Sequence, residues 1–574
     1  MPIKSPYPAT PAIPEVNAHY ALLRRPDQAQ WSNFPIHINA ETGQSRGFKD
    51  FVQRVEWAAT ALGSPVDKGG LGLSGDNGDM IGIMSANCMD YITFAHACLY
   101  ITTPFALISS YSKPFELKNT LTLSRATCLF IDEKFLSMAL PIAKEAGLPS
   151  TRIFIMTGNA PGYKNFSQLI DEARTKNFAV LNVQPAKKNT LAYLVFSSGT
   201  TGLPKAVMIS HGNLLGVIAQ YSLLGQIAQK GKSTEPNEPF KVLAFLPLHH
   251  TYGFFTFIIG MFLFPTTSII MSQWNIDLAL DLIPKYRINR LPLIPSIVYQ
   301  LVHHPKLAKT DLTSITYVNS GAAYLSPKLA EKLSSFIPQK ADFIEGYGMS
   351  EGTVATLRSP APGSLDGRLN PRRGSTGVLL PNLVAKILRE DGTEADVNEV
   401  GELWIKGPTV SLGYWNNEKA TKETFVDGWL KTGDKFRVNE DGYFFFADRA
   451  KDTLKVSGAQ VSPVEIEDLL LAHPKKLIED VTVAGVSGGR TSDEKVPRAW
   501  IVLSCEGKNL GEATVIKELE RWHQKNLSKY KWLRGGIEIV NEIPKSPTGK
   551  VLRRELQDRF EQRLVHTKKA MSKL

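Results

Sequence analysis

The chain has 574 residues, of which 43% are hydrophobic and 21% charged, and this composition excludes a fibrous or wholly disordered protein. Its four Cys residues, at positions 88, 98, 128 and 505, show no CxxC spacing, which argues against a zinc site or disulfide framework and favours a reducing compartment. The longest apolar run, residues 253–264, is shorter than the roughly 20 residues of a bilayer span, so we expect no transmembrane segment.

The net charge of +11 is concentrated near the C-terminus, where residues 521–574 contain 14 Lys or Arg and 5 Asp or Glu (14 − 5 = +9). A basic patch can bind nucleic acid or a membrane surface. However, Val515, Leu519 and Trp522 have the spacing of one helix face, which favours a buried stripe beside a solvated basic surface. We therefore expect no nucleic-acid partner.

In the first half of the chain, short apolar runs alternate with amphipathic stretches. The runs 80–87 and 126–132 are each followed by such a stretch, and further runs occur at 151–158 and 191–198. This alternation predicts an α/β fold with largely parallel sheets. From Gly401 onward, the runs GELWIKG, TVSLGYW, DGWLKTGD and DGYFFFADR, with Gly and Asp-Gly turns, predict a β-rich subdomain.

After Asp448 the pattern predicts a compact α+β unit. It comprises a hairpin, a helix at 463–471, strands at 481–486 and 499–503, a further helix and a closing helix. In the closing helix Leu552, Leu556, Phe560 and Leu564 repeat every four residues, as a buried stripe does. We expect a large N-terminal domain, residues 1–448, and a small mobile domain, residues 452–574, joined near Lys451.

A segment rich in Gly, Ser and Thr, Ser197-Ser-Gly-Thr-Thr-Gly-Leu-Pro-Lys205, directly follows the apolar run 191–196. Its small residues let backbone N–H groups and hydroxyls approach a polyphosphate, and Lys205 adds positive charge. No Gly-Lys-Ser/Thr closes the segment, so it is not a Walker A loop. Taken alone, it could also be a plain loop.

This segment closely resembles the phosphate loop of the adenylate-forming superfamily of acyl-CoA synthetases, peptide-synthetase adenylation domains and firefly-type luciferases. Further motifs of that superfamily follow in the expected order over roughly residues 45–565. The resemblance implies ATP and Mg²⁺ binding, an acyl-adenylate intermediate and CoA as cosubstrate. It assigns the nucleotide phosphates to Ser197, Ser198, Gly199, Thr200, Thr201, Gly202 and Lys205, with Thr200 also near the metal.

The motif Leu246-Pro-Leu-His-His-Thr-Tyr-Gly253 is similar to the superfamily's acid-binding region. The resemblance implies that His250 gates the site of the carboxylate substrate; the less favoured alternative is a structural His at a helix start. Tyr252 and Thr256 would lie on one side of a helical turn, and they match acid-pocket positions of plant 4-coumarate–CoA ligases.

Two motifs in the middle of the chain resemble the adenine site. In Ser320-Gly-Ala-Ala-Tyr-Leu325, Gly321, Ala322 and Ala323 would let adenine and the acyl group lie against the backbone, and Tyr324 replaces the usual Pro. In Gly346-Tyr-Gly-Met-Ser-Glu351, the resemblance implies adenine stacking on Tyr347 beside Gly348, and a Ser350 hydroxyl at the α-phosphate. It also implies Mg²⁺ at Glu351, whose carboxylate is the ligand type that Mg²⁺ prefers; Glu345 stands where relatives commonly have Gln.

The last motifs lie at and beyond the domain boundary. Thr432-Gly-Asp434 alone is a turn sequence, but the resemblance implies that Asp434 and Arg449 bind the ribose and that Lys451 is the hinge. Lys455, Gly458 and Gln460 match positions facing the adenylate or CoA. In Ile543-Pro-Lys-Ser-Pro-Thr-Gly-Lys550, Lys550 would bridge the carboxylate and the α-phosphate as charge develops, whereas a lone Lys is usually a surface residue.

Within the superfamily the resemblance is closest to 4-coumarate–CoA ligases and their peroxisomal relatives. The aromatic wall 254–257 beside Tyr252 suits an aryl acid, but it would also hold a medium-chain fatty acyl group. An amino-acid adenylation module, a luciferase-type oxidase and a non-catalytic binding paralogue remain as alternatives. Against the first, no carrier domain follows Lys550; against the last, Lys550, Glu351 and Asp434 are present.

The sequence ends in Ser572-Lys573-Leu574. This tripeptide at a C-terminus is a peroxisomal address read by an import receptor. We therefore expect that receptor as a partner and the peroxisome as the location, besides the carboxylic acid and CoA as small-molecule partners.

Overall fold

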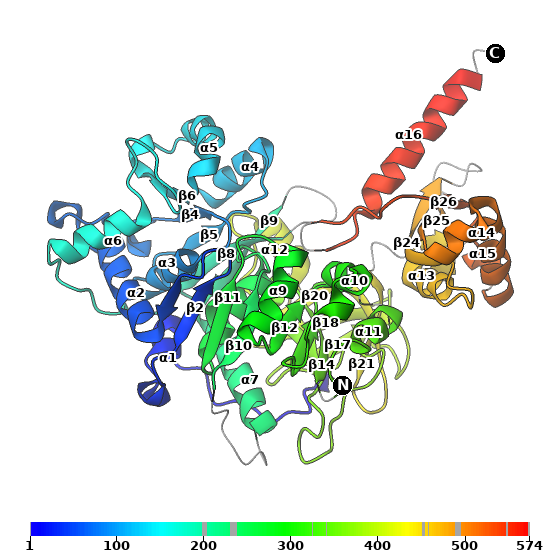
Figure 1. Cartoon of the computed structure of the whole chain (residues 1–574), viewed down its shortest axis with the longest axis horizontal. Helices are drawn as coiled ribbons and strands as arrows, with labels where there is room; N and C mark the ends of the chain where they lie inside the picture. Colours follow the sequence, from blue (N-terminus) through cyan, green and yellow to red (C-terminus); the bar gives the residue numbers. More distant parts are fainter. Residues whose placement is uncertain are drawn as a thin grey trace.

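The computed structural model describes residues 2–197, 204–229, 238–323, 325, 327–339, 341–449, 454–456, 459–487, 495–527, 529–546 and 549–571. Within them, no helix combines the length and the apolarity that crossing a membrane requires. Figure 1 shows a large body formed by the first three quarters of the chain and a smaller one at its side, from which the last helix extends.

The first sheet confirms the predicted alternation of strands and helices. Its strands lie in the order β7-β6-β4-β5-β8-β9. Every neighbouring pair is parallel except β8 and β9, which are antiparallel to each other. The helices between them present apolar side chains to the sheet; Tyr91 and Phe94 of α3 are fully buried. The strands are β4 (Ile81–Met84), β5 (Phe105–Leu107), β6 (Cys128–Ile131), β7 (Ile153–Ile155), β8 (Leu191–Ser197) and β9 (Lys205–Ser210), and the helices are α2 (Phe48–Gly63), α3 (Met89–Tyr100), α4 (Pro114–Ser124), α5 (Glu133–Glu145) and α6 (Phe166–Thr175).

A second, longer sheet forms the centre of the large domain. Its order is β16-β15-β14-β13-β12-β10-β11-β2-β3, and the strands from β14 to β2 are parallel. The strands are β2 (Pro35–Asn39), β3 (Ser45–Gly47), β10 (Phe240–Ala244), β11 (Thr266–Ile270), β12 (Arg290–Leu293), β13 (Tyr317–Ser320), β14 (Asp342–Gly348), β15 (Ala355–Arg358) and β16 (Val378–Leu379), and the helices are α1 (Ala18–Leu23), α7 (His211–Gln229), α8 (Thr251–Phe254), α9 (Ile276–Tyr286), α10 (Pro295–His303) and α11 (Pro327–Ser334).

The predicted β-rich subdomain is an antiparallel sheet, with one correction. The run TVSLGYW is not a strand of this sheet; it lies along β9, where Leu412 N donates to Met208 O at 3.0 Å and Met208 N to Gly413 O at 2.9 Å. This alternating segment therefore covers the β9 edge of the first sheet. The sheet contains β1 (Ile3–Lys4), β17 (Val384–Leu388), β18 (Gly401–Lys406), β19 (Phe425–Val426), β20 (Trp429–Val438) and β21 (Phe444–Arg449), with α12 (Glu418–Thr424) before β19.

The small domain has its own core and matches the predicted order of elements. The helix predicted at 463–471 is α13, while the closing helix starts after Leu552, so Leu552 lies outside it and Leu556 is its deeply buried residue. On α15, Val515, Leu519 and His523 form the buried face and Trp522 is half-buried beside it. The elements are β22 (Leu454–Val456), β23 (Ala459–Val461), α13 (Pro463–Leu471), β24 (Ile478–Ser487), β25 (Lys495–Leu503), α14 (Cys505–Leu510), α15 (Glu512–Asn526), β26 (Ile537–Ile539) and α16 (Arg553–Met571).

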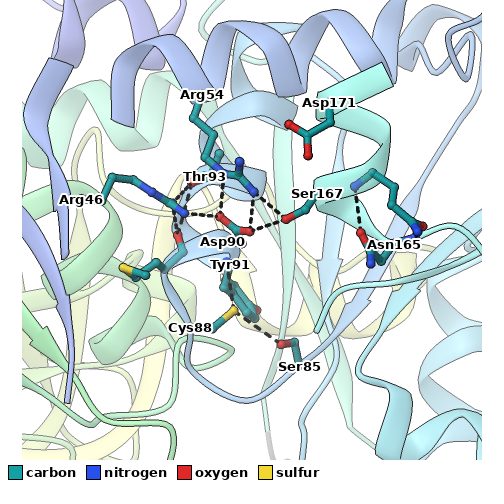
Figure 2. Close-up of polar contacts among 12 residues, drawn as sticks. Arg46, Arg54, Ser85, Cys88, Asp90, Tyr91, Thr93, Asn165, Ser167 and Asp171 are labelled. Carbon is teal, nitrogen blue, oxygen red and sulfur yellow. Dashed lines mark hydrogen bonds and ion pairs between the residues drawn. The ribbon is translucent and has the colours of Figure 1, made fainter. Parts of the chain in front are cut away.

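A polar network joins the helices beside the first sheet (Figure 2). Asp90, in the first turn of α3, accepts hydrogen bonds from Arg54 of α2 at 2.9 and 2.8 Å and pairs with Arg46 of β3 at 2.8 Å. Ser167 of α6 contacts both Arg54 and Asp90. Burial raises the pKa of Asp90, but its bonds to Arg54 and the charge of Arg46 outweigh this and leave the pKa lowered. Asp90 is thus a charged junction between three helices and a strand.

Candidate active site

A cavity of about 2130 Å³ lies where the second sheet, the antiparallel sheet and the small domain meet. Most of the described predicted site residues line it, although they come from distant parts of the chain. The carboxyl ends of parallel strands gather at one sheet edge, which is where ligands bind in such sheets. The predicted residues that line the cavity are Ser197, Lys205, His250, Tyr252, Thr256, Gly321, Ala322, Ala323, Tyr347, Gly348, Ser350, Glu351, Asp434 and Lys550.

The remaining predicted site residues are described in part or not at all. Arg449 ends β21 directly opposite Asp434 of β20, and Lys455 of β22 pairs with Gln460 of β23, but the side chains of these three residues are not described. The other predicted positions lie outside the described residues: Ser198, Gly199, Thr200, Thr201, Gly202, Lys451 and Gly458, as do Tyr324 and Ser572–Leu574.

The end of β14 brings two predicted nucleotide residues together. The Tyr347 hydroxyl donates to Oδ2 of Asp434 at 2.6 Å, and Asp434 is buried. The register of β14 against β15 shifts at Gly348, where an added Cβ would lie 1.9 Å from the Val354 carbonyl oxygen. Only a glycine fits this approach, so the strand can turn and present the residues that follow it.

The backbone of the predicted adenine motif is in a sparsely populated conformation. Ala322, after the end of β13, has φ of 70°, in the left-handed region that residues with a side chain rarely adopt. Backbone strain of this kind costs about 1–3 kcal/mol and concentrates at functional sites. Its position on the cavity wall agrees with a binding role for this turn.

Glu351 lies in a buried polar group with Tyr414. It is 6% exposed, and its Oε1 accepts a hydrogen bond of 2.8 Å from the Tyr414 hydroxyl. Lys205 Nζ lies 4.6 Å from the centroid of the Tyr414 ring, so Tyr414 joins a carboxylate and an ammonium group on the cavity wall. Tyr414 was not among the predicted site residues, because its run has the alternation of an ordinary strand.

The His pair lies at the start of α8. His250 is its N-cap residue and faces the cavity, while His249 is buried behind it with ring centroids 4.5 Å apart. Burial lowers the pKa of His250 to about 4, so its ring is neutral at pH 7. The next residue, Thr251, bonds through its hydroxyl to the Ser350 hydroxyl at 3.1 Å, which links α8 to the turn after β14.

Lys550 reaches the cavity from the small domain. Its loop is closed by Ser546, whose N donates to the Lys550 carbonyl at 2.8 Å and whose hydroxyl accepts from Lys550 N at 3.1 Å. Gly549, with φ of 81°, packs so closely on α10 that an added Cβ would lie 2.5 Å from Ser296 Oγ. The small domain is therefore docked on the large one with Lys550 at the cavity.

The deeper part of the cavity has an apolar wall with polar groups set into it. Tyr252 and Thr256 line it, and the Tyr252 hydroxyl accepts from Asn319 Nδ2 at 2.5 Å. Arg290 and Arg358 also line it, and neither stood out in the sequence, since each is an isolated residue on a short strand. Thr256 belongs to a π-helical turn, Phe255–Ile259, a rare geometry often found at functional sites.

Comparisons with known proteins agree with this arrangement. Residues 27–415 match the model of the AMP-binding enzyme family, and residues 465–550 match that of the AMP-binding enzyme C-terminal domain. The chain is 35% identical to "Probable 4-coumarate–CoA ligase 1" of Dictyostelium discoideum, over 88% of this chain and 90% of the relative. It is 32% identical to "Acyl-CoA synthetase 7" of Caenorhabditis elegans, over 78% and 79%.

The fold is also that of a solved adenylate complex. The anthranilate CoA ligase AuaEII, solved with anthranoyl-AMP, matches 96% of this chain and 99% of its own with a TM-score of 0.79 and 23% identity. At this identity the match supports the fold: a large α/β domain followed by a small domain. Because the family model covers more than half of the chain, the chain belongs to the AMP-binding enzyme family.

Proposed function

We propose that this chain is an AMP-forming acid–CoA ligase, which joins a carboxylic acid to CoA through an acyl adenylate and releases pyrophosphate and AMP. The observation that carries the proposal is that Lys550 of the small domain and Lys205, Glu351 and Asp434 of the large domain face one cavity. The two lysines suit a reaction that builds negative charge between an acid and a polyphosphate, and the two carboxylates suit the binding of a metal ion and of ribose hydroxyls.

The nucleotide would lie between the end of β14 and the antiparallel sheet. Tyr347 would stack on adenine, Asp434 and Arg449 would bind the ribose, and Gly321 to Ala323 would form the floor. The hydrogen bond from Tyr347 to Asp434 holds both side chains at the same place before ligand arrives. The phosphates would extend toward Lys205 and the loop 197–205, with Ser350 at the α-phosphate.

Glu351 is suited to bind Mg²⁺. Its buried carboxylate has oxygen atoms of the kind that Mg²⁺ prefers, and one of them is oriented by Tyr414. The described residues contain no cluster of three or more His, Cys, Asp or Glu suited to a metal ion, so the protein would supply few ligands and the phosphates and water the rest. Bound Mg²⁺ would neutralise phosphate charge; Thr200 is the second proposed contact.

In the first half-reaction the acid's carboxylate attacks the α-phosphorus of ATP, the bond to the β-phosphate oxygen breaks, and pyrophosphate leaves. Lys550 donates hydrogen bonds to both reacting groups as charge develops. His250, neutral at pH 7, lies beside the carboxylate without adding a competing charge. In the second half-reaction the CoA sulfur attacks the acyl carbon and AMP leaves; the small domain moves about Lys451, bringing Lys455, Gly458 and Gln460 to the adenylate.

For the acid we propose an aryl acid of the 4-coumarate type, with a medium-chain fatty acid as the second candidate. The relatives' names include a 4-coumarate–CoA ligase and an acyl-CoA synthetase, and the apolar wall that includes Tyr252 and Phe255 suits flat rings and alkyl chains. The location we propose is the peroxisome, on the ground of Ser572-Lys573-Leu574. A fluorescent protein carrying the last residues of the chain should enter peroxisomes, and the same fusion without the tripeptide should stay outside.

The test of the activity is pyrophosphate release from Mg-ATP by the purified protein, across cinnamates, benzoates, phenylacetates and fatty acids, with and without CoA. We expect acid-dependent release that CoA accelerates, with an acyl-CoA product detected by mass spectrometry. Release that depends on amino acids, or that CoA does not accelerate, would instead favour an adenylation module or an oxidase. Release independent of any acid would contradict the proposal.

A further inference from the structure

Two arginines face the deep end of the acid cavity from β12 and β15, two strands of one sheet with β13 and β14 between them. Arg290 begins β12 and pairs in register with Tyr317 of β13, while Arg358 ends β15 and pairs with Gly346 of β14. Residues paired in register on adjacent strands point to the same face of a sheet. Both arginines are half-buried and line the cavity, so their open surface faces it.

The two guanidinium groups flank one tyrosine. Arg358 Nη2 donates to the Tyr317 hydroxyl at 2.6 Å, and the Arg290 guanidinium carbon lies 5.6 Å from the Tyr317 ring centroid. The other face of Arg290 stacks on Phe240 at 3.4 Å from the ring centroid, and Arg358 lies 5.9 Å from the ring of Tyr221. Aromatic rings thus orient both groups and leave their N–H donors to be satisfied by something else.

Neither arginine has a carboxylate partner among the described residues. Within the part of the chain that the structure describes, neither guanidinium forms an ion pair with an Asp or Glu, and Arg290 Nε is buried there without a hydrogen-bond partner. Asp342, paired with Tyr317 in the next strand, and Glu345 also line the cavity, but neither is within ion-pair distance of the two arginines. Burial lowers the pKa of Arg290 to about 10, assisted by the charge of Arg358 and opposed by Tyr317, so both remain cationic at pH 7.

This arrangement is unfavourable for the empty protein. Two like charges flank Tyr317 on the cavity wall, and a partly buried charge without a counter-charge is unfavourable. Natural proteins keep such groups where a ligand supplies the opposite charge. An arginine fork matches the two oxygens of a carboxylate in geometry and charge.

The two arginines lie at the opposite end of the cavity from the reacting groups. Arg290 lies four residues before Ile294 along an extended strand, and Tyr317 lies four residues before Gly321. At the rise of a strand, four residues separate the two ends of the cavity wall by about 13 Å. Between these ends the cavity is lined by apolar side chains, among them Val242, Phe255 and Met261. An acid with its carboxylate at Lys550 would therefore present its far end to Arg290 and Arg358.

We propose that the acid activated by this enzyme carries a second carboxylate at its far end, bound by Arg290 and Arg358 on either side of Tyr317. This inference rests on the proposed ligase function and names the class of its substrate: a dicarboxylic acid, with an aryl or alkyl body. Only the carboxylate beside Lys550 is activated, because the far one is held away from the nucleotide.

The experiment compares acids that differ only at the far end. Matched pairs are cinnamate with 4-carboxycinnamate and decanoate with decanedioate, with kcat/KM measured by pyrophosphate release in the presence of CoA. The wild type should prefer the diacid in at least one pair by about 10-fold or more, the scale of a charge-assisted hydrogen bond. In Arg290→Met and Arg358→Met that preference should fall by about 10-fold or more, while kcat/KM for the monoacid stays within about threefold.

Two further variants separate binding from folding. Arg290→Lys keeps the charge and should retain part of the diacid preference. Arg437→Met is the matched control, because Arg437 also stacks on a phenylalanine, 4.2 Å from the Phe445 ring centroid, but does not line the cavity; its diacid preference should equal that of the wild type. Thermal unfolding of every variant reports its folding directly.

Equal or better use of the monoacids by the wild type, or an equal loss with both acids in Arg290→Met, would overturn the inference and leave the ligase function standing. Absence of acid-dependent pyrophosphate release with every acid would instead count against the proposed function itself. Should the methionine variants fail to fold, protection of the wild type against thermal unfolding by decanedioate and not by decanoate decides the question.

Discussion

The hydroxyl of Tyr414 donates a 2.8 Å hydrogen bond to Oε1 of Glu351 on the wall of the cavity. Burial, followed by the nearby charge of Glu351, raises the pKa of Tyr414, so the hydroxyl keeps its proton. The tyrosine thus fixes one carboxylate oxygen and leaves the other for a cation. In the function we propose, this pair would orient a metal ligand from behind, although the two residues are far apart in the sequence.

Replacing Tyr414 with Phe should weaken the use of Mg-ATP. Loss of the donor to a buried carboxylate costs about 1–3 kcal/mol, so we expect the KM for Mg-ATP to rise about 10-fold, with a smaller change for the acid. Steady-state pyrophosphate release at varied Mg-ATP measures this. Tyr443→Phe removes a hydroxyl that is also buried but bonds to Asn370 O outside the cavity, and it should leave the KM unchanged. Equal KM values for the two variants would contradict the role of the pair.

Replacing Lys550 with Ala should slow adenylation by about 100-fold or more, the scale for loss of one group that stabilises transition-state charge. Thioester formation from pre-made acyl adenylate should change much less, because in the mechanism we propose Lys550 acts only in the first half-reaction. Rapid-quench measurement of each half-reaction tests this. Lys517→Ala, at an exposed position of α15, is the control. A similar loss in both half-reactions would refute the proposal that the small domain takes one position for adenylation and another for thioester formation.

Glu345 provides a pH-dependent test. Burial raises the pKa of Glu345 from 4.5 to about 7. The folded protein therefore holds this proton more tightly than the unfolded chain, and stability is lost as pH rises from about 4.5 through 7. Glu345→Gln is always neutral. At pH 8 its free energy of unfolding, measured with urea, should exceed that of the wild type by up to a few kcal/mol, and at pH 4 the two should be nearly equal.

For that comparison, Glu418→Gln on exposed α12 is the control and should follow the wild type at both pH values. A stability difference between Glu345→Gln and the wild type that does not change with pH would mean that folding does not raise the pKa of Glu345.

Asp90 should be a main support of the large domain (Figure 2). Asp90→Asn removes the charge that Arg46 and Arg54 both contact and leaves two arginines without a counter-charge. We expect a loss of about 3–5 kcal/mol in the free energy of unfolding at pH 7. Urea unfolding followed by tryptophan fluorescence measures it. Glu145→Gln on α5, where Glu145 forms an exposed ion pair with Lys118, should cost less than about 1 kcal/mol; similar losses in both variants would contradict the account.

Much of the architecture follows from local sequence patterns. The alternation of apolar runs and amphipathic stretches correctly predicted the parallel first sheet, and the helix at 463–471 was predicted within its observed bounds. The order of motifs led to the family to which the chain belongs. These features depend on neighbours within a few residues, where the period of side chains and the chemistry of turns decide the outcome.

The run containing Tyr414 marks where local pattern is insufficient. Its alternation predicted a strand of the β-rich subdomain, but the segment covers the edge of β9 instead and so brings Tyr414 to Glu351. An alternating segment satisfies its backbone equally well on either sheet. The choice between them depends on which edge the rest of the chain leaves open.

The sequence by itself determined the family and the kinds of domain, and it predicted which residues meet the nucleotide, because each of these is written in a contiguous motif. Only the tertiary structure decided what lies at the far end of the acid cavity. Arg290, Tyr317 and Arg358 are single residues on three strands, and none carries a motif. They meet because strand order and register place them on one sheet face, and that order is set by packing between distant segments.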